Sequence, residues 1–364
     1  MQIIRGLWNL HHALQQQAAA GCALTIGNFD GVHRGHQAML ALLIEQARRL
    51  GVPSCVLSFE PHPRDYFAAH YRQPELAPAR IATLRDKLDQ LARAGVDRCV
   101  ILPFNARLAA QSPQSFIDDT LVRALGVRYL LVGDDFRFGR RRAGDYALLQ
   151  AASQSQGFAL ARMPSYEIEQ ANGPGLRVSS TAVREALSAG RMEEVATLLG
   201  RPYSISGHVL HGRKLGRELG ASAPGLGNGF RTLNLRFAHW KPAASGIFAV
   251  HVHGLGPSAD AAALRGVANL GVRPSLDPDD VNGGRVLLET HCLDWPAALA
   301  AALPGAEAYG KIIRVELLHK LHDELKYDSL DALTRGIAQD CDTARAFFAS
   351  LQAQTQRQTT RDRI

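Results

Sequence analysis

The first half of the chain alternates apolar runs typical of strands with longer segments of helical periodicity. Strands are expected at 22–27, 54–59, 98–103, 128–133 and 158–163, and helices at 35–50, 80–94, 113–125 and 143–156. In the first helical segment, Met39, Leu43, Ala47 and Leu50 recur at three- and four-residue steps, which predicts one buried stripe. This alternation predicts an α/β unit, a parallel sheet with helices on both faces.

Four glycines mark the expected ends of these helices. Gly51, Gly95, Gly126 and Gly157 each follow a helical segment, where a left-handed residue commonly caps the last turn. In a parallel sheet of this type, ligands bind beyond the carboxyl ends of the strands. The residues that follow each strand are therefore the first candidates for chemistry.

The second half of the chain has a different pattern, with many strands and little helix between them. After a short helix near 191–199, strands are expected at 203–211, 231–237, 246–253, 264–270, 285–293 and 311–319, and a last helix at 328–350. Six strands with glycine-rich connections predict a closed or nearly closed antiparallel barrel, an all-β unit with a C-terminal helix. We therefore expect domains at 1–186 and 187–350, followed by a polar, disordered tail at 351–364.

Length and composition agree with two intracellular domains. The 364 residues suggest two domains, and no apolar run approaches the ~20 residues that span a bilayer. The N-terminus lacks the features of a signal peptide, so we expect a soluble, cytoplasmic protein without a membrane partner. The five scattered cysteines form no CxxC pair, which argues against a disulfide framework or a structural zinc site. The sequence leaves a homo-oligomer open.

The net charge of +7 suits an anionic partner, although scattered surface charge explains it equally well. The densest basic cluster is RFGRRR at 137–142, which lacks the interleaved aromatics that stack nucleic-acid bases. A basic nucleic-acid binder would bind DNA or RNA in a salt-sensitive way. We expect no nucleic-acid partner.

The segment GNFDGVHRGH, residues 27–36, stands where the first strand turns into the first helix. Free N–H groups and the positive end of the helix dipole favour a phosphate at such a turn. His33 and His36 are three residues apart and project on one side, where they can donate to oxygens that gain charge during nucleotidyl transfer. The alternatives are half of a metal site, for which no second close-spaced pair is present, or a structural turn.

This segment resembles the HxGH signature of the nucleotidylyltransferase superfamily. More narrowly, it resembles the form found in bacterial bifunctional riboflavin kinase/FMN adenylyltransferases. Three further segments resemble motifs of that family in the expected order, SFEPHP at 58–63, VGDDFRFG at 132–139 and VSSTAVREAL at 178–187. The resemblance implies that a Rossmann-like N-terminal domain joins FMN to the AMP moiety of ATP and releases pyrophosphate, with Mg²⁺ on the phosphates.

The resemblance also implies which residues act in this domain. His33 and His36 would be catalytic, by positioning and charge stabilisation rather than by general base catalysis. The expected nucleotide- and phosphate-binding residues are Gly27, Asn28, Phe29, Asp30, Gly35, Ser179, Ser180, Thr181 and Arg184, and the expected flavin-binding residues are His62, Asp135, Phe136 and Arg137. Plainer alternatives are a simple helix cap for the Ser-Ser-Thr group, a structural role for His62 and a solvated loop for the arginines.

A second group of residues points to ATP and Mg²⁺ in the barrel. The glycine-rich segment 207–220 resembles the family's kinase loop and assigns ATP binding to Gly212, Lys214, Gly216 and Gly220. Thr232 and Asn234 are two residues apart on an expected strand, so their oxygens share a face and can hold Mg²⁺ as well as ATP. Thr is common in strands, so this pair is weak evidence without the surrounding motifs.

Glu289 stands in an apolar expected strand, where a carboxylate is costly unless it is paired or used. It resembles the family's catalytic base, which takes the proton from the ribityl 5′-hydroxyl of riboflavin as that oxygen attacks the γ-phosphate of ATP. The alternative is a carboxylate that points outward from an alternating strand. The chain departs from the family pattern at Arg231, Ser275, His322 and the longer link 221–229. Arg231 and the link adjoin the proposed Mg²⁺ and phosphate site, so these two departures bear on the efficiency of the kinase.

These observations predict a bifunctional enzyme that phosphorylates riboflavin to FMN and then adenylylates FMN to FAD. Its partners would be riboflavin, FMN, FAD and ATP. An alternative keeps only the adenylyltransferase and treats the barrel as a flavin-binding or weakly active module.

Overall fold

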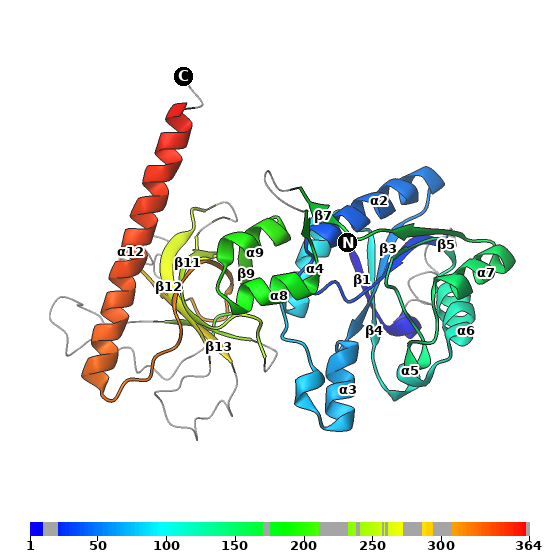
Figure 1. The fold of residues 1–364 in the computed structure, drawn as a ribbon, viewed down its shortest axis with the longest axis horizontal. Coiled ribbons are helices and arrows are strands. Elements are labelled where there is room, and N and C mark those ends of the chain that lie inside the picture. The colour runs from blue at the N-terminus through cyan, green and yellow to red at the C-terminus, as the bar shows by residue number, and fades with distance from the viewer. Residues whose placement is uncertain are drawn as a thin grey trace. The chain divides into compact units, whose positions relative to one another are not determined.

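The computed structural model describes the chain except for residues 10–20, 170–174, 211–231, 238–240, 257, 259–260, 272–285, 294–307 and 362–364. The described chain divides into two compact units. The first comprises Met1–Pro78 and Lys87–Ala182, and the second comprises Ala79–Asp86 and Val183–Ile364. Each unit contains a sheet of six strands (Figure 1). The expected combination of an α/β unit and a β-barrel unit is confirmed.

The first unit is a parallel sheet in the strand order β1-β4-β3-β2-β5-β6. Its strands are β1 (Gln2–Arg5), β2 (Cys22–Ile26), β3 (Ser54–Glu60), β4 (Arg98–Pro103), β5 (Val127–Gly133) and β6 (Ala159–Met163). Its helical segments are α2 (Arg34–Leu50), α3 (Pro63–Tyr71), η1 (Pro74–Leu76), α5 (Ala106–Ala110), α6 (Pro113–Ser115), the π-helix η2 (Phe116–Ala124), η3 (Arg140–Arg142) and α7 (Tyr146–Gln156). From β2, the chain adds β3 and then β4 on one side of the sheet. It then adds β5 and β6 on the other side of β2. The point between β2 and β5 is therefore the topological switch point, where ligands bind in such sheets.

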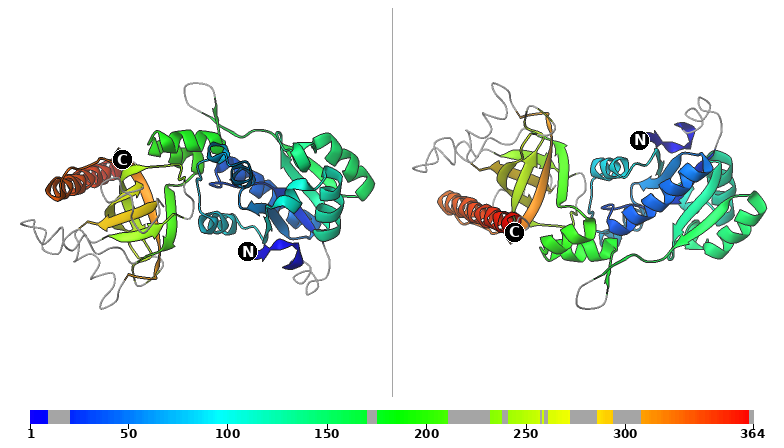
Figure 2. Two further views of the ribbon diagram at one scale, coloured as in Figure 1. Left: turned by 90° about the horizontal axis from the view of Figure 1, so that it is seen from below. Right: turned by 90° about the horizontal axis from the view of Figure 1, so that it is seen from above.

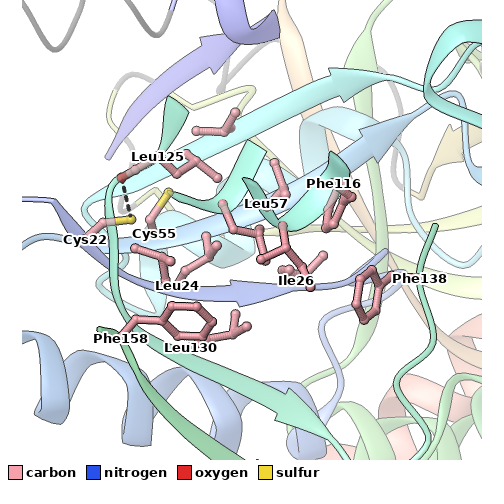
Figure 3. Close-up of a cluster of buried hydrophobic side chains, with 14 of the residues drawn as sticks. Cys22, Leu24, Ile26, Cys55, Leu57, Phe116, Leu125, Leu130, Phe138 and Phe158 are labelled. Carbon is pink, nitrogen blue, oxygen red and sulfur yellow. Dashed lines mark hydrogen bonds between the residues drawn. The ribbon is translucent and has the colours of Figure 1, made fainter. Parts of the chain in front are cut away.

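Side chains of β2 alternate between two apolar layers. Ala23 packs with Leu43 and Ala47 of α2 on one face of the sheet, whereas Leu50 of the predicted stripe is exposed. Leu24 and Ile26 pack on the other face with residues that include Phe116 of η2, as Figure 3 shows. Because both faces are covered, almost every residue of β2 and β3 is buried, which explains their nearly continuous apolar sequence.

The sequence predicted strands β2 to β6 of this sheet but missed, among other short elements, strand β1 and helix α3. Gly51, Gly95, Gly126 and Gly157 have positive φ values of 64°, 87°, 59° and 77°, so the predicted caps are confirmed. Strand β1 has only four residues and pairs with β4 at the edge, a long-range contact that local sequence does not encode. Helix α3 begins at Pro63 behind the His62 cap and has no extended apolar stripe.

The second unit contains the six expected antiparallel strands in the order β10-β13-β12-β11-β14-β9. They are β9 (Tyr203–His208), β10 (Leu233–Arg236), β11 (Gly246–His253), β12 (Leu264–Gly271), β13 (Leu287–Cys292) and β14 (Ile312–His322). The Leu210 N–H donates to the Asn234 carbonyl at 2.8 Å, which connects the end of β9 to β10. This bridge joins the two edges of the sheet and produces the nearly closed barrel that the sequence predicted.

The described chain also contains four further helices and a small hairpin. They are α4 (Leu84–Arg93), α8 (Ser180–Ser188), α9 (Met192–Leu199) and α12 (Leu330–Arg361), with the hairpin β7 (Glu167–Ile168) and β8 (Leu176–Arg177). Among the residues that the structure describes, no helix is long and apolar enough to cross a membrane.

Helix α12 packs along one side of the barrel, and both views of Figure 2 show it beside the strands. Cys341, Ala344 and Phe348 of the helix contact Ala249 and Val267 of the barrel. The helix continues through 351–361, so the expectation of a disordered tail there is corrected. The segment contains no glycine or proline, and its glutamines, alanine and arginines propagate a helix that is already nucleated.

Residues Ala79–Asp86 fold with the second unit, which the expected division at residue 186 did not anticipate. The Arg80 N–H donates to the Lys241 carbonyl at 2.9 Å. The Asp86 carboxylate accepts bonds from the Thr83 hydroxyl at 2.7 Å and from the backbone N–H and hydroxyl of Ser206. Helix α4 therefore begins in one unit and continues in the other.

His322 links the end of β14 to α12. Its Nε2 lies 2.8 Å from Asp340 Oδ1, and its Nδ1 lies 2.7 Å from the Asp323 carbonyl. Both partners accept hydrogen bonds, so the ring makes both bonds in its cationic form, in which each ring nitrogen carries a proton. Burial lowers the pKa of His322, but the bonds to Asp340 and Asp323 outweigh it and raise the pKa above its ordinary value.

We expect the contribution of His322 to stability to be present below about pH 6.5 and to be lost as the pH rises through its raised pKa. Because the pKa of His322 is higher in the native state, a larger fraction of native than of unfolded protein keeps this proton above pH 6.5. Stability therefore falls as the pH rises in that range. Substituting His322→Gln should cost about 1 kcal/mol at pH 6 and less at pH 9. Urea unfolding of both proteins at the two pH values measures the difference, and an equal cost at both would contradict the cationic assignment.

Candidate active sites

The turn between β2 and α2 contains backbone conformations that most residues disfavour. Phe29, Gly31 and Val32 all have positive φ values, 49°, 84° and 42°. Such a conformation costs about 1–3 kcal/mol for a residue other than glycine and persists where the surrounding structure enforces it. Phe29 and Val32 are buried at 1% exposure, so packing fixes the strained turn. Strain of this kind clusters at ligand sites.

The two histidines that the sequence singled out lie face to face at the start of α2. Their ring centroids are 3.7 Å apart and the ring planes differ by 17°. His33 is the N-cap of the helix, and its Nδ1 accepts the His36 backbone N–H at 3.3 Å. A neutral His33 therefore carries its proton on Nε2. The Phe29 ring lies against His36, with centroids 4.9 Å apart.

His36 is a neutral imidazole at physiological pH. Burial, and then the neighbouring His33, lower the pKa of His36 well below its ordinary value. Its Nδ1 is buried and has no hydrogen-bond partner among the described residues. A buried polar atom without a partner is costly unless a ligand supplies one. His36 can therefore present a polar ring atom to a ligand without adding positive charge.

Gly35 allows the His33 ring to lie close to the backbone. A Cβ at this position would stand 3.3 Å from the His33 ring and 3.3 Å from Tyr166 Cβ. Both distances are tighter than normal packing, and neither neighbour is the loose end of a flexible chain. In the HxGH segment, the third residue is a glycine because the ring of the first histidine lies against its backbone.

The start of α8 meets this turn. The Ser180 hydroxyl donates to the Asp30 carbonyl at 3.2 Å, although 150 residues separate them. Ser179 Oγ accepts the Ala182 N–H at 3.2 Å, so the simpler helix-cap interpretation of this serine is also correct. Thr181 is exposed. Arg184 belongs to the second unit, where its Nε donates to the Ala79 carbonyl at 2.7 Å.

The residues after β5 follow the strand beside β2, on the other side of the switch point. Asp135 and Arg137 are exposed, and Arg137 Nη1 lies 3.4 Å from Asp145 Oδ2. The half-buried Phe136 ring stacks on Phe138, with centroids 5.6 Å apart and an angle of 18°. An aromatic face and a cation thus follow the strand that pairs with β2.

His62 caps α3, and its Nδ1 accepts the Arg64 N–H at 3.1 Å, which agrees with its structural alternative. The sequence missed the aromatic group that follows it. The Tyr66 and Phe67 rings both pack edge-on against Phe104, with centroids 5.4 and 5.7 Å away. Phe104 follows β4, so this group forms only when β3 and β4 pair.

The sequence also missed Lys87, which is buried beneath the histidine turn at 3% exposure. Its signal was present in α4, where Lys87 stands three residues after Leu84 and four before Leu91, on the apolar stripe. A lysine on such a stripe is seldom fully buried unless it is paired.

In the barrel, three polar residues lie side by side across neighbouring strands. Glu289 of β13 is directly opposite Asn234 of β10 and, on the other side, Asn269 of β12. Directly opposite residues share a face of the sheet. Asn234 is 5% exposed, and its buried Oδ1 and that of Asn269 have no hydrogen-bond partner among the described residues. Sequence periodicity could not identify Asn269, because its position opposite Glu289 depends on strand register.

Glu289 is half-buried and shares a face with these amides, whereas Leu288 and Thr290 on either side are fully buried on the opposite face. Thr232 is half-buried just before β10. Gly212, Lys214, Gly216 and Gly220 lie outside the described residues, as do Arg231, Ser275 and the link 221–229. Within the described part of the chain, no three or more His, Cys, Asp or Glu side chains gather in a way that could hold a metal.

Two family models match the chain, one to each unit. Residues 15–182 match the model of FAD synthetase, and residues 199–348 match the model of riboflavin kinase. The boundary between the matches falls within the helices α8 and α9 and the link between them.

Curated relatives match over nearly the whole chain. Proteins named bifunctional riboflavin kinase/FMN adenylyltransferase are 41% identical in Haemophilus influenzae, 43% in Escherichia coli and 43% in Pseudomonas fluorescens. Each match covers 96% of this chain and at least 98% of the relative. A crystal structure from Streptococcus pneumoniae named as a macrolide-efflux protein is similar in fold, with a TM-score of 0.65, 22% identity and coverage of 94% of this chain and 98% of that one.

Proposed function

Since this chain belongs to the family of bifunctional riboflavin kinases/FMN adenylyltransferases, we propose that its two units divide two ATP-dependent reactions between them. The chain phosphorylates riboflavin to FMN and adenylylates FMN to FAD, with release of pyrophosphate. Residues 1–186 would carry the adenylyltransferase and residues 187–350 the kinase. The observation that carries this division is the stacked His33–His36 pair in one unit and the Asn234–Glu289–Asn269 row in the other.

In the adenylyltransferase, the phosphate of FMN attacks the α-phosphorus of ATP and pyrophosphate leaves. A phosphate oxygen is already a nucleophile, so the protein has to position two anions and stabilise the charge that develops. His33 and His36 would bind these oxygens through ring N–H groups, because both rings lie at the start of α2, where the helix dipole favours anions. The turn 27–30 and the Ser179–Thr181 cap would hold the phosphates.

The flavin would lie over aromatic surface at the carboxyl ends of the strands. Phe136 offers a ring face after β5, and Arg137 offers a cation for the FMN phosphate. The group formed by Tyr66, Phe67 and Phe104 offers a further aromatic surface in the same unit. Of the residues proposed for flavin, His62 has the weakest support, because its Nδ1 is engaged in capping α3.

In the kinase, the ribityl 5′-hydroxyl of riboflavin attacks the γ-phosphorus of ATP and ADP leaves. Glu289 would accept the hydroxyl proton, since it lies on the same face of the sheet as two buried amide oxygens that need partners. The unpartnered Oδ1 of Asn234 fits a hard cation, so Asn234 and Thr232 would hold Mg²⁺. When bound, Mg²⁺ neutralises part of the phosphate charge.

Incubating the purified protein with riboflavin and ATP, and separately with FMN and ATP, tests the proposal. The first mixture should yield FMN and then FAD, and the second FAD alone, as resolved by chromatography of the fluorescent flavins. FAD from FMN without any FMN from riboflavin would support the alternative in which the barrel only binds flavin.

Metal removal gives a further expected result. Adding EDTA in excess over the metal should stop both reactions, and restoring Mg²⁺ should recover them. Both reactions require a cation that shields the negative charge of the ATP triphosphate. Substituting Asn234→Ala should raise the Mg²⁺ concentration needed for half-maximal FMN formation while leaving that for FAD formation unchanged. Equal Mg²⁺ dependence in the variant and the wild type would refute the assignment of Asn234.

A further inference from the structure

Lys87 is a cation buried beneath the adenylyltransferase turn, and the following inference about it rests on the proposed function of that turn. Its side chain is 4% exposed. Burying an ammonium group is costly unless hydrogen bonds and charge compensate it. The strand ends of β2 and β3 supply this compensation.

The Lys87 ammonium group lies near oxygen atoms of Asn28, Ser58 and Glu60. Its Nζ donates to the Asn28 carbonyl at 3.4 Å and to the Ser58 hydroxyl at 3.3 Å, and it lies 3.8 Å from Glu60 Oε2. The Ser58 hydroxyl in turn donates to the same Asn28 carbonyl at 3.4 Å. Lys87 and Ser58 therefore both hold one carbonyl, in the middle of the segment that the sequence singled out.

The orientation of that carbonyl fixes the peptide plane between Asn28 and Phe29. A trans peptide is planar, so its C=O and N–H point in opposite directions. With the Asn28 carbonyl held toward Lys87, the Phe29 N–H points away from Lys87. Phe29, which follows this peptide, has φ 49°, a conformation that few residues other than glycine adopt.

The same peptide also sets the place of a catalytic ring. The Phe29 side chain is 1% exposed, and its ring lies against His36 with centroids 4.9 Å apart. A contact chain thus runs from Lys87 to the Asn28 carbonyl, then to Phe29 and to His36. Rotation of the peptide would move both the Phe29 N–H and the support of the His36 ring.

We infer that Lys87 is a positioning residue of the adenylyltransferase, which holds the Asn28–Phe29 peptide so that the turn and His36 are arranged for the phosphates of ATP. Lys87 acts through the protein and does not touch the reacting atoms. Its loss should therefore affect ATP turnover in this reaction and leave the kinase reaction intact.

The test uses Lys87→Met in the full chain, which keeps the length of the side chain and removes the charge and the donors. We expect kcat/KM for ATP in FAD formation to fall about tenfold or more, because a displacement near 1 Å at a reacting group costs up to a hundredfold. The KM for FMN should stay within about twofold, and FMN formation from riboflavin in the same chain should be unchanged. A general loss of folding would move all of these together.

Ser58→Ala and Ser54→Ala provide a matched pair on β3, since both serines are fully buried. Ser58 bonds the Asn28 carbonyl, whereas Ser54 bonds Asp97 at the other end of the strand. Ser58→Ala should lower kcat/KM for ATP and Ser54→Ala should not. In the double variant with Lys87→Met, the two losses should be less than additive, because both act on one carbonyl.

Three outcomes would overturn the inference. The first is a Lys87→Met protein whose kcat/KM for ATP lies within about twofold of the wild type. The second is a double variant in which the losses from Ser58→Ala and Lys87→Met are strictly additive. The third is an equal effect of Ser58→Ala and Ser54→Ala on kcat/KM for ATP. If Lys87→Met does not fold, the serine pair alone decides. A wild-type protein that forms no FAD from FMN and ATP would instead refute the proposed function.

Discussion

Substituting His36→Ala is expected to lower FAD formation from FMN and ATP by about a hundredfold or more, with FMN formation from riboflavin unchanged. Removing one preorganised donor from a site where charge develops typically costs that much. His36 is suited to this role because burial lowers its pKa and keeps its ring neutral. It can therefore donate a hydrogen bond without repelling the His33 ring, whose centroid lies 3.7 Å from its own. The measurement is the initial rate of each half-reaction, each started with its own flavin.

Two companion variants separate donation from simple support of the fold. His36→Gln retains a neutral N–H donor and should keep more activity than His36→Ala. Glu45→Ala, an exposed change on the same helix, should leave both rates unchanged. Equal losses in the alanine and glutamine variants would contradict a donor role, and loss of FMN formation in a folded His36→Ala protein would contradict separate sites.

The second large effect is expected for Glu289→Gln. FMN formation from riboflavin should fall by about a hundredfold to ten thousandfold, the range for removal of a general base. The amide keeps the size of the side chain beside Asn234 and Asn269 but cannot take the hydroxyl proton. FAD formation from supplied FMN should continue at the wild-type rate.

A control carboxylate is available in the same barrel. Glu316 of β14 is also largely buried and is paired with Arg314 at 2.8 Å, away from the row on β10, β13 and β12. Glu316→Gln should reduce stability without lowering kcat for either reaction. Undiminished FMN formation in Glu289→Gln would show instead that this carboxylate is only a polar residue on an alternating strand.

The sequence predicted those features that local physics encodes. Apolar periodicity located the strands and helices, and glycines at left-handed positions located the helix ends, as at Gly51 and Gly157. The pair His33 and His36 could be found because both residues belong to one turn. Their stacking follows from the helix start and from Gly35, which are also local.

The features that the sequence did not predict depend on contacts between distant segments. Asn269 meets Glu289 only through strand register, and Ser206 meets Asp86 across 120 residues. The place of Lys87 beneath Asn28 required the packing of α4 against the ends of β2 and β3. Residues 351–361 were wrongly expected to be disordered because they lack apolar anchors, yet the preceding helix continues through Arg361.

The most direct test of two separate sites is to mix the His36→Ala and Glu289→Gln proteins and supply riboflavin and ATP. Each protein alone should form almost no FAD from riboflavin, the first stopping at FMN and the second at riboflavin. The mixture should form FAD, because FMN released by the first protein is adenylylated by the second. A mixture that forms no FAD, although the second protein still converts added FMN, would contradict the division of the chain into two independently acting sites.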